Sequence, residues 1–221
     1  MKTIYEFLLK SKTAVSTQGI GYVDLGLKSG LLWARCNIGA DEPTEYGDYF
    51  MWGSTEPDTD KSCGWKNCPF NDGKSQFNDE YFKSIKNKVC PNNILASEYD
   101  AATVILGDGW RLPTDDDYKE LIHNAEHEWI TNYQGSRTNG ILFTSNMNGA
   151  ELFIPASGFR DWSSFHNDGK GAHLWSSTIC GTAAYYAYNI CLSGSVSSLK
   201  CFCFMNGNNR SAGFCLRGVK K

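Results

Sequence analysis

The chain has 221 residues, of which 41% are hydrophobic and 14% are aromatic, and its formal net charge is −3. This length and composition allow one substantial core filled by large side chains, and the 22 glycines indicate many turns. The weakly acidic charge, the lack of a basic stripe and the lack of an apolar run near ~20 residues argue against nucleic-acid binding and membrane insertion.

Residues 1–18 form the first predicted segment and differ from the rest of the chain. Ile4, Phe7 and Leu8 have helical spacing, and a Ser/Thr-rich run from 11 to 18 follows them. We see no apolar signal-peptide core and no small-residue cleavage site, so we expect no secretory signal. The segment is either a frayed terminus or a docking tether that attaches the domain to a larger assembly.

The main domain is predicted to span residues 19–221 and to begin with short aromatic strands. Residues 22–27 and 31–34 are strand-like on either side of a Lys28-Ser29-Gly30 turn. Residues 46–52 supply a third strand. We see no linker that would divide the chain into two domains.

A long polar stretch and the first helices follow. Residues 54–93 are rich in Asp, Asn, Lys, Gly and Ser, which predicts a loop region with a short helix at 79–88. Ser97 can cap the next helix, with Asp100 three residues later and Gly107 at its end. Each of these signals is local and needs no tertiary contact.

The helix after Pro113 has the clearest start signal in the chain. Thr114 is the predicted N-cap, and three aspartates occupy the first turn, at the positive end of the helix dipole. An apolar stripe with helical spacing predicts the buried face. The stripe consists of Tyr118, Leu121, Ile122, Ala125 and Trp129.

Short strands and turns are predicted from Gly135 to the end of the chain. Alternating apolar and polar residues indicate half-exposed strands in the last part. The predicted strands are 141–143, 152–155, 174–177, 186–192 and 200–204, and residues 214–219 close the domain. With two well-signalled helices and many short strands, the expected class is α+β.

Several motifs in a fixed order resemble the Fibrobacter major paralogous (FISUMP) domain family, which is common in gut and rumen Bacteroidetes and their phages. The resemblance implies a C-type-lectin-like domain with two helices and short twisted antiparallel strands, a fold similar to that of the formylglycine-generating enzymes. A fold alone does not fix a function. The motifs are GYVDLGL at 21–27, GLLWA at 30–34, YGDYFMWG at 46–53, YDAAT at 99–103, GWRLPT at 109–114, LFIPASGFR at 152–160, LWSS at 174–177 and GFCLR at 213–217.

The composition of residues 178–213 suggests a binding surface. Asn, Tyr, Ser, Cys, Gly, Ala and Phe dominate there, and acidic residues are absent. Antibody loops favour Tyr, Ser, Gly and Asn because Tyr gives large rigid contacts and the others adapt their hydrogen bonds. The segment also resembles the product of a diversity-generating retroelement, which would make it hypervariable. A fixed interaction surface and an ordinary polar β-turn region are the alternatives.

Strand alternation predicts which side chains of this segment are available. Ile190 and Leu192 are expected to face the core, which leaves Asn189 and Cys191 pointing outward. Phe202 and Phe204 are likewise expected inward. The predicted binding residues are Ile179, Cys180, Tyr185, Tyr186, Asn189, Cys191, Lys200, Cys201, Cys203, Asn206, Asn208 and Asn209.

Nine cysteines, without an export signal, predict reduced thiols. Cys201 and Cys203 could be a redox or copper pair of the formylglycine-generating type, but they lack the C-x-x-C spacing. His123 and His127 match an H-x-x-E-H zinc pattern on the predicted helix, yet lie opposite its apolar stripe. Glu56-Pro57-Asp58 only partly matches a lectin calcium motif. We therefore predict no catalytic residue, metal or cofactor.

The sequence as a whole predicts a non-enzymatic ligand-binding or adhesion module. Its expected partner is a bacterial surface protein or glycan, and residues 1–18 would bind a virion assembly partner. The preferred setting is a phage tail or fibre receptor-binding protein, which assembles in the host cytoplasm and needs no signal. The alternatives are a cell-surface or secreted bacterial protein and an enzyme of the formylglycine-generating type.

Overall fold

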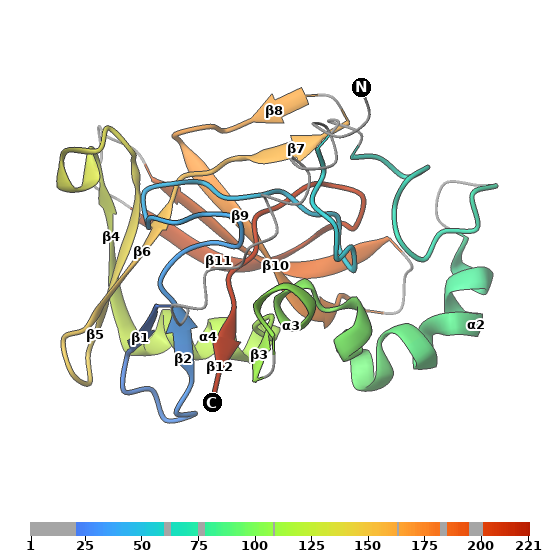
Figure 1. Cartoon of the computed structure of the whole chain (residues 1–221), viewed down its shortest axis with the longest axis horizontal. Coiled ribbons are helices and arrows are strands. Elements are labelled where there is room, and N and C mark those ends of the chain that lie inside the picture. Colours follow the sequence, from blue (N-terminus) through green and yellow to red (C-terminus); the bar gives the residue numbers. More distant parts are fainter. Residues whose placement is uncertain are drawn as a thin grey trace, which may run out of the picture.

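The computed structural model describes residues 21–59, 63–74, 78–107, 109–162, 164–181, 185–194 and 201–221, and of residues 201–204 only the backbone. The predicted tether, residues 1–18, lies outside the described residues. Figure 1 shows the arrangement of the helices and strands.

The described strands form four antiparallel sheets. The first has the order β1 (Tyr22–Asp24), β2 (Leu32–Ala34), β12 (Val219–Lys220) and β3 (Trp110–Arg111). The central sheet has the order β11 (Cys201–Asn209), β10 (Tyr186–Gly194) and β9 (Gly171–Ile179). The others are β4 (Ala125–Ile130), β5 (Gly140–Ser145) and β6 (Glu151–Pro155), and the pair β7 (Phe159–Asp161) and β8 (Ser164–His166).

The described helices are short, and fewer residues lie in helices than in strands. The α-helices are α2 (Asp79–Val89), α3 (Ala101–Leu106) and α4 (Asp115–Asn124), and the 3-10 helices are η1 (Pro91–Asn93), η2 (Ser97–Tyr99) and η3 (Tyr133–Gly135). The expected α+β, C-type-lectin-like class is therefore wrong: the chain has a β-rich fold. Two segments explain the error, because β4 continues the predicted helix as a strand and β7–β8 form a hairpin where no strand was expected.

β9 and most of β10 in the central sheet are covered on both faces and separate two hydrophobic cores. Side chains of β9 and β10 alternate between them: Leu174 and Ile190 pack in the first core, and Trp175 and Ala187 in the second. The first core also holds buried residues of α4 and β4–β6, and the second those of α2 and α3. When a sheet is covered on both faces, few side chains of its middle strand, here β10, are exposed.

The predicted start of α4 is confirmed, and its predicted end is wrong. The Thr114 hydroxyl accepts from the Asp117 N–H, and the Asp117 carboxylate accepts from the Thr114 N–H, which is a complete capping box. The helix ends at Asn124, so Ala125 and Trp129 belong to β4. The helix at 79–88 is confirmed as α2, whereas α3 is capped by Asp100 and not by Ser97.

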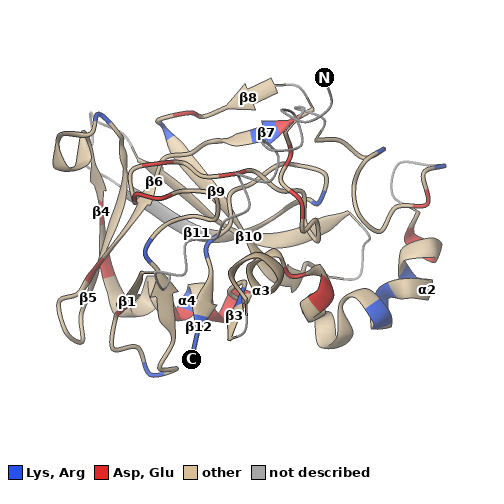
Figure 2. Ribbon diagram, viewed as in Figure 1, with Lys and Arg blue, Asp and Glu red and all other residues tan. Residues whose placement is uncertain are grey.

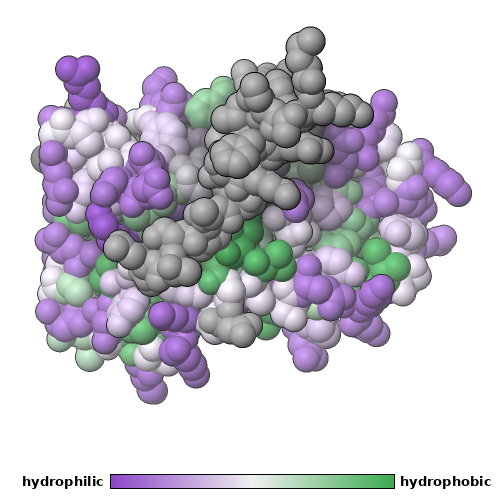
Figure 3. Space-filling view, viewed as in Figure 1, coloured by the Kyte–Doolittle hydropathy of each residue, from purple (hydrophilic) through white to green (hydrophobic). Residues whose placement is uncertain are grey.

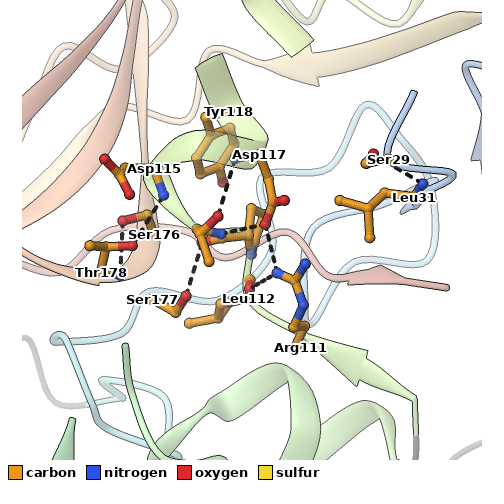
Figure 4. A network of polar contacts seen from close by, with 12 residues as sticks. Ser29, Leu31, Arg111, Leu112, Asp115, Asp117, Tyr118, Ser176, Ser177 and Thr178 are labelled. Atoms are coloured by element: carbon orange, nitrogen blue, oxygen red, sulfur yellow. Dashed lines mark hydrogen bonds and ion pairs between the residues drawn. The ribbon is translucent and has the colours of Figure 1, made fainter. Parts of the chain in front are cut away.

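The N-terminus of α4 is joined to the end of β9, as Figure 4 shows. The Asp115 N–H donates to the Thr178 hydroxyl at 3.1 Å, and the Ser177 N–H donates to the Pro113 carbonyl at 2.8 Å. These bonds fix the end of β9, from which the predicted binding segment begins.

Arg217 joins parts of the chain that are far apart in sequence. Its guanidinium is fully buried and donates to the Asn37 side chain and to the carbonyls of Ala34, Arg35 and Phe153. Burial lowers the pKa of Arg217 to about 10, which still leaves it charged near neutral pH. Four acceptors therefore satisfy one buried cation and tie β2 and β6 to the C-terminus.

The surface of the described residues is mixed in polarity. On the face in Figure 3, the hydrophobic residues drawn in colour form small patches between hydrophilic ones. None of the described helices has the length and apolar character needed to cross a membrane.

Candidate functional site

The predicted binding residues lie mainly on β10 and β11, which pair along their full length. The register joins Tyr186 to Asn209 at one end and Gly194 to Cys201 at the other. Directly opposed residues share a face of an antiparallel pair. Asn189 and Cys191 therefore share the face of the second core with Asn206 and Asn208.

Asn189 was predicted to point outward, and the structure shows it fully buried. Its Oδ1 accepts from the Asn208 amide at 2.9 Å, and its Nδ2 lies 3.1 Å from His173 Nδ1 and 3.2 Å from the carbonyl of Ile190. The prediction failed because β10 is the middle strand of a sheet with cores on both faces, so alternation does not leave one face in water.

His173 of β9 continues this polar row toward Cys191. Because the amide nitrogen of Asn189 can only donate, Nδ1 of His173 accepts. The proton of the neutral ring is then on Nε2, which lies 3.8 Å from Cys191 Sγ. The His173 ring also packs against Phe159 and Phe214. Burial lowers the pKa of His173 to about 4, so it is neutral near pH 7.

Cys191 is half-buried rather than fully outward. Burial raises the pKa of its thiol, so the protonated form dominates near neutral pH. A catalytic cysteine needs the thiolate. The row formed by Asn208, Asn189, His173 and Cys191, which we call the polar row, is thus uncharged and linked by hydrogen bonds or close polar contacts.

The opposite face of the same strands carries a second part of the predicted set. A side chain at Gly207 would meet Cys180 Sγ at 2.8 Å, so Cys180 lies directly against this glycine. A side-chain hydrogen bond with Cys180 raises the pKa of Tyr188. Tyr186, 47% exposed, precedes Tyr188 on the same face.

Ile179, another predicted surface residue, lies in the second core with 2% of its surface exposed. It ends β9, and its neighbour across the sheet is Ala187, which is also fully buried. The surface assignment of Ile179 is therefore wrong: an aliphatic side chain at a covered strand end packs inward.

The accessible members of the predicted set lie around the start of β10 and on the second half of β11, with Tyr186 on the face of the first core and Asn206 and Asn208 on that of the second. Asn206 is exposed, and Tyr185, Asn208 and Asn209 are half-buried. The rings of Tyr185 and Tyr186 lie 6.1 Å apart. Lys200 lies outside the described residues, and for Cys201 and Cys203 only the backbone is described. Apart from Cys191 of the polar row, the solvent-accessible members are Cys180, Tyr185, Tyr186, Asn206, Asn208 and Asn209, which we call the candidate surface.

Charges are absent from the strands that carry this surface. Residues 171–179, 186–194 and 201–209 contain no Lys, Arg, Asp or Glu. In Figure 2 the ribbons of β9 and β10 are accordingly tan. Recognition by this surface would depend on shape, aromatic contact and neutral hydrogen bonds rather than on ion pairs.

Arg210 anchors the end of β11 and was not predicted. It is fully buried, with its guanidinium carbon 4.5 Å from the Phe82 ring centre and its Nη1 donating to the Pro69 carbonyl at 3.0 Å. Its N–H donates to the Tyr185 carbonyl at 2.9 Å. The backbone beneath the candidate surface is thereby fixed, although a lone Arg after Asn-Asn gives no sequence signal of burial.

The structure separates the residues of the zinc alternative. His123 is in the last turn of α4, where its Nδ1 lies 2.7 Å from the Lys119 carbonyl, and His127 is on β4 beside Phe143. Both were predicted on one helix. Among the residues that the structure describes, no group of three or more His, Cys, Asp or Glu side chains could hold a metal ion.

Asp58, from the partial lectin calcium motif, has its carboxylate bonded to other side chains of the protein. Cys63 Sγ donates to its carboxylate at 3.1 Å, and Arg160 lies 3.5 Å from the same oxygen.

No family model, no curated protein and no solved structure matches this chain.

Proposed function

We propose that this chain is a non-enzymatic ligand-binding or adhesion module whose candidate surface contacts a bacterial surface protein or glycan. The observation that carries the proposal is the pairing of accessible Tyr and Asn side chains with a backbone held by buried groups. Tyr186 and Asn206 are exposed, whereas Asn189, which lies opposite Asn206 on β10, and Arg210, which follows β11, are fully buried. Rigid elements with accessible Tyr and Asn side chains suit recognition, because little order must be gained on binding.

The setting we favour is the tail or fibre of a phage virion, with residues 1–18 binding the assembly partner. This rests on the resemblance to a family found in Bacteroidetes and their phages, and on the candidate tether. Mass spectrometry of purified virions tests it: the chain should be present as a stoichiometric component. Recovery only from the bacterial surface or medium would support the cell-surface or secreted alternative.

Binding can be tested on intact Bacteroidetes cells and on a glycan array with the full-length chain. We expect Tyr186→Ala and Asn206→Ala to weaken binding about ten-fold, as anchor residues do. Tyr22→Ala on β1 and Asn146→Ala before β6 are matched controls, because both residues are exposed and belong to sheets other than the central one or to their connections. Equal binding by all four variants would contradict the proposal.

The hypervariable form of the proposal makes a separate prediction. Sequencing the 3′ end of the gene in its source population should show substitutions at codons of the candidate surface apart from Asn208 of the polar row, and none at Ile179, Asn189 or Arg210. The reason is that only accessible positions can change without loss of the core. An invariant segment would leave a surface with one fixed partner.

The enzyme alternative is tested through Cys201 and Cys203. If the chain were of the formylglycine-generating type, Cys201→Ser or Cys203→Ser would abolish oxidation of a substrate cysteine in a peptide assay. We expect no such activity in the wild type.

A further inference from the structure

The outer strand of the central sheet, β11, has one free edge in the described structure. The sheet order is β11-β10-β9, so β10 pairs with only one side of β11. Among the described residues, no strand or isolated bridge pairs with the other side. The far edge of β9 differs, because Gly158 donates to Gly171 and Trp175 donates to Cys215 there.

The backbone groups that face this free edge follow from the register. The Arg210 N–H donates to the Tyr185 carbonyl, which continues the pairing of Tyr186 with Asn209 by one residue. In an antiparallel pair, every second residue exchanges both bonds with its partner and the residues between point away. Met205, Gly207 and Asn209 therefore direct N–H and C=O away from β10.

The composition of β11 contrasts with that of the other outer strands. Natural sheets protect their edges with charge, proline or short length. β4 carries the exposed Glu126 and Glu128, β6 carries Glu151 and Pro155, and β1, β3, β7 and β8 have two or three residues each. β11 has nine residues without a charge or a proline. A strand of this kind is suited to pairing with another strand.

We propose that β11 pairs antiparallel with β11 of a second copy of this chain, around a two-fold axis, so that two central sheets become one. The distribution of carboxylates on the outer strands favours β11 of a second copy as the partner strand. Docking of β11 on β4 or β6 of another copy would bring carboxylates to the interface, whereas two β11 strands bring none. Two-fold dimers are also the commonest closed assemblies, because one surface serves both partners. This inference goes beyond the proposed function and needs no ligand.

The first test is the mass of the full-length chain in solution. Analytical ultracentrifugation at micromolar concentrations should show a dimer of the 24.6 kDa chain. Asn206→Lys places a charge on an exposed position of β11, and a two-fold axis near the middle of the strand would bring the two lysines close together. We expect about a ten-fold or larger rise in the dimer dissociation constant, because like charges oppose association.

The matched control is Asn146→Lys, which adds the same charge at an exposed position before β6. It should dimerise as the wild type does, and circular dichroism should show both variants folded. A monomeric wild type overturns the proposal, as does equal dimerisation of wild type and Asn206→Lys. Because no ligand is present, this result is independent of the binding tests.

Hydrogen exchange locates the interface and separates a second copy from a covering segment of the same chain. The amides of Met205, Gly207 and Asn209 should become more protected as protein concentration rises. Protection that does not depend on concentration would mean that the chain covers its own edge, and this overturns the proposal.

Discussion

Asn189 is the side chain on which the three central strands converge. It is fully buried, accepts from Asn208 of β11 and contacts His173 of β9. A buried polar group that loses its partner costs about 1–3 kcal/mol. A slip of β10 by one residue would leave three polar side chains unpaired, so Asn189 specifies the register of the central sheet as well as its stability.

We expect Asn189→Ala to lower the free energy of unfolding by about 2 kcal/mol, because it leaves the Asn208 amide and His173 Nδ1 without this partner. Urea unfolding measures the change. The control is Asn206→Ala on the neighbouring strand, whose exposed side chain should contribute less than about 0.5 kcal/mol. Similar losses in both variants would show that the buried contacts of Asn189 are not stabilising.

His173 makes stability depend on pH. Burial lowers its pKa from 6.5 to about 4, and its neighbours Asn189, Cys191, Phe159 and Phe214 are neutral. Below about pH 6.5 the unfolded chain binds a proton at this histidine that the folded chain does not. The contribution of neutral, buried His173 to the free energy of unfolding is therefore complete above about pH 6.5 and is lost progressively toward about pH 4.

The free energy of unfolding should therefore fall by about 2 kcal/mol through His173 between about pH 7.5 and about pH 5. The measurement is urea unfolding at both pH values for wild type and His173→Phe, which cannot titrate. The variant should lose less stability on acidification than the wild type does. The same slope in both proteins would assign the acid sensitivity to other groups.

Alternation identified Ile190 and Leu192 as core residues, and both are confirmed as buried. It failed for Asn189 because the sequence does not show whether one or both faces of a strand pack against a core. Polar residues in a strand usually indicate a face exposed to solvent. Here the polar side chains satisfy one another, which depends on three strands brought together by tertiary structure.

At the scale of elements, the start of α4 is encoded locally and its stability can be tested locally. Thr114→Ala removes the hydroxyl that accepts from the Asp117 N–H, and we expect a loss of about 1 kcal/mol in urea unfolding. Thr114→Ser keeps the hydroxyl and should stay close to wild type. A Ser variant as unstable as the Ala variant would point to the methyl group rather than to the cap.

The end of α4 shows why local signals do not always suffice. Ala125 and Trp129 continue an apolar stripe with helical spacing, but residues four apart also share a face of a strand. Both side chains are buried, so the predicted burial is right although the element is wrong. Pairing of β4 with β5 decides between the two structures, and that partner lies ten or more residues later in the chain.

For the whole molecule, the arrangement of two cores on one sheet predicts a single unfolding transition. Ile190→Val trims the first core and Ile179→Val the second, each by one methyl group, and each should cost about 1 kcal/mol. Both variants should shift the midpoints of tryptophan fluorescence and circular dichroism together, because the cores share β9 and β10. Separate midpoints would mean that the cores unfold independently.

The sequence predicted most of the strands and α2. It gave the wrong fold class, because the segments at 125–130 and 159–166 become strands only through pairing partners. The expected outward positions of Ile179 and Asn189 failed for a related reason, since both depend on the second core. The binding function and the virion setting stay predictions.

The two-sided burial of the central sheet has a consequence for protein engineering. On an ordinary half-exposed sheet, a library can randomise every second residue of a strand. Here the tolerant codons should be confined to the start of β10, near Tyr186, and the second half of β11, near Asn206, with the polar row and Arg210 held constant. Such a scaffold would offer a small variable binding surface on strands whose buried residues do not change. Selected binders should therefore differ in specificity, whereas their melting temperatures should stay close together.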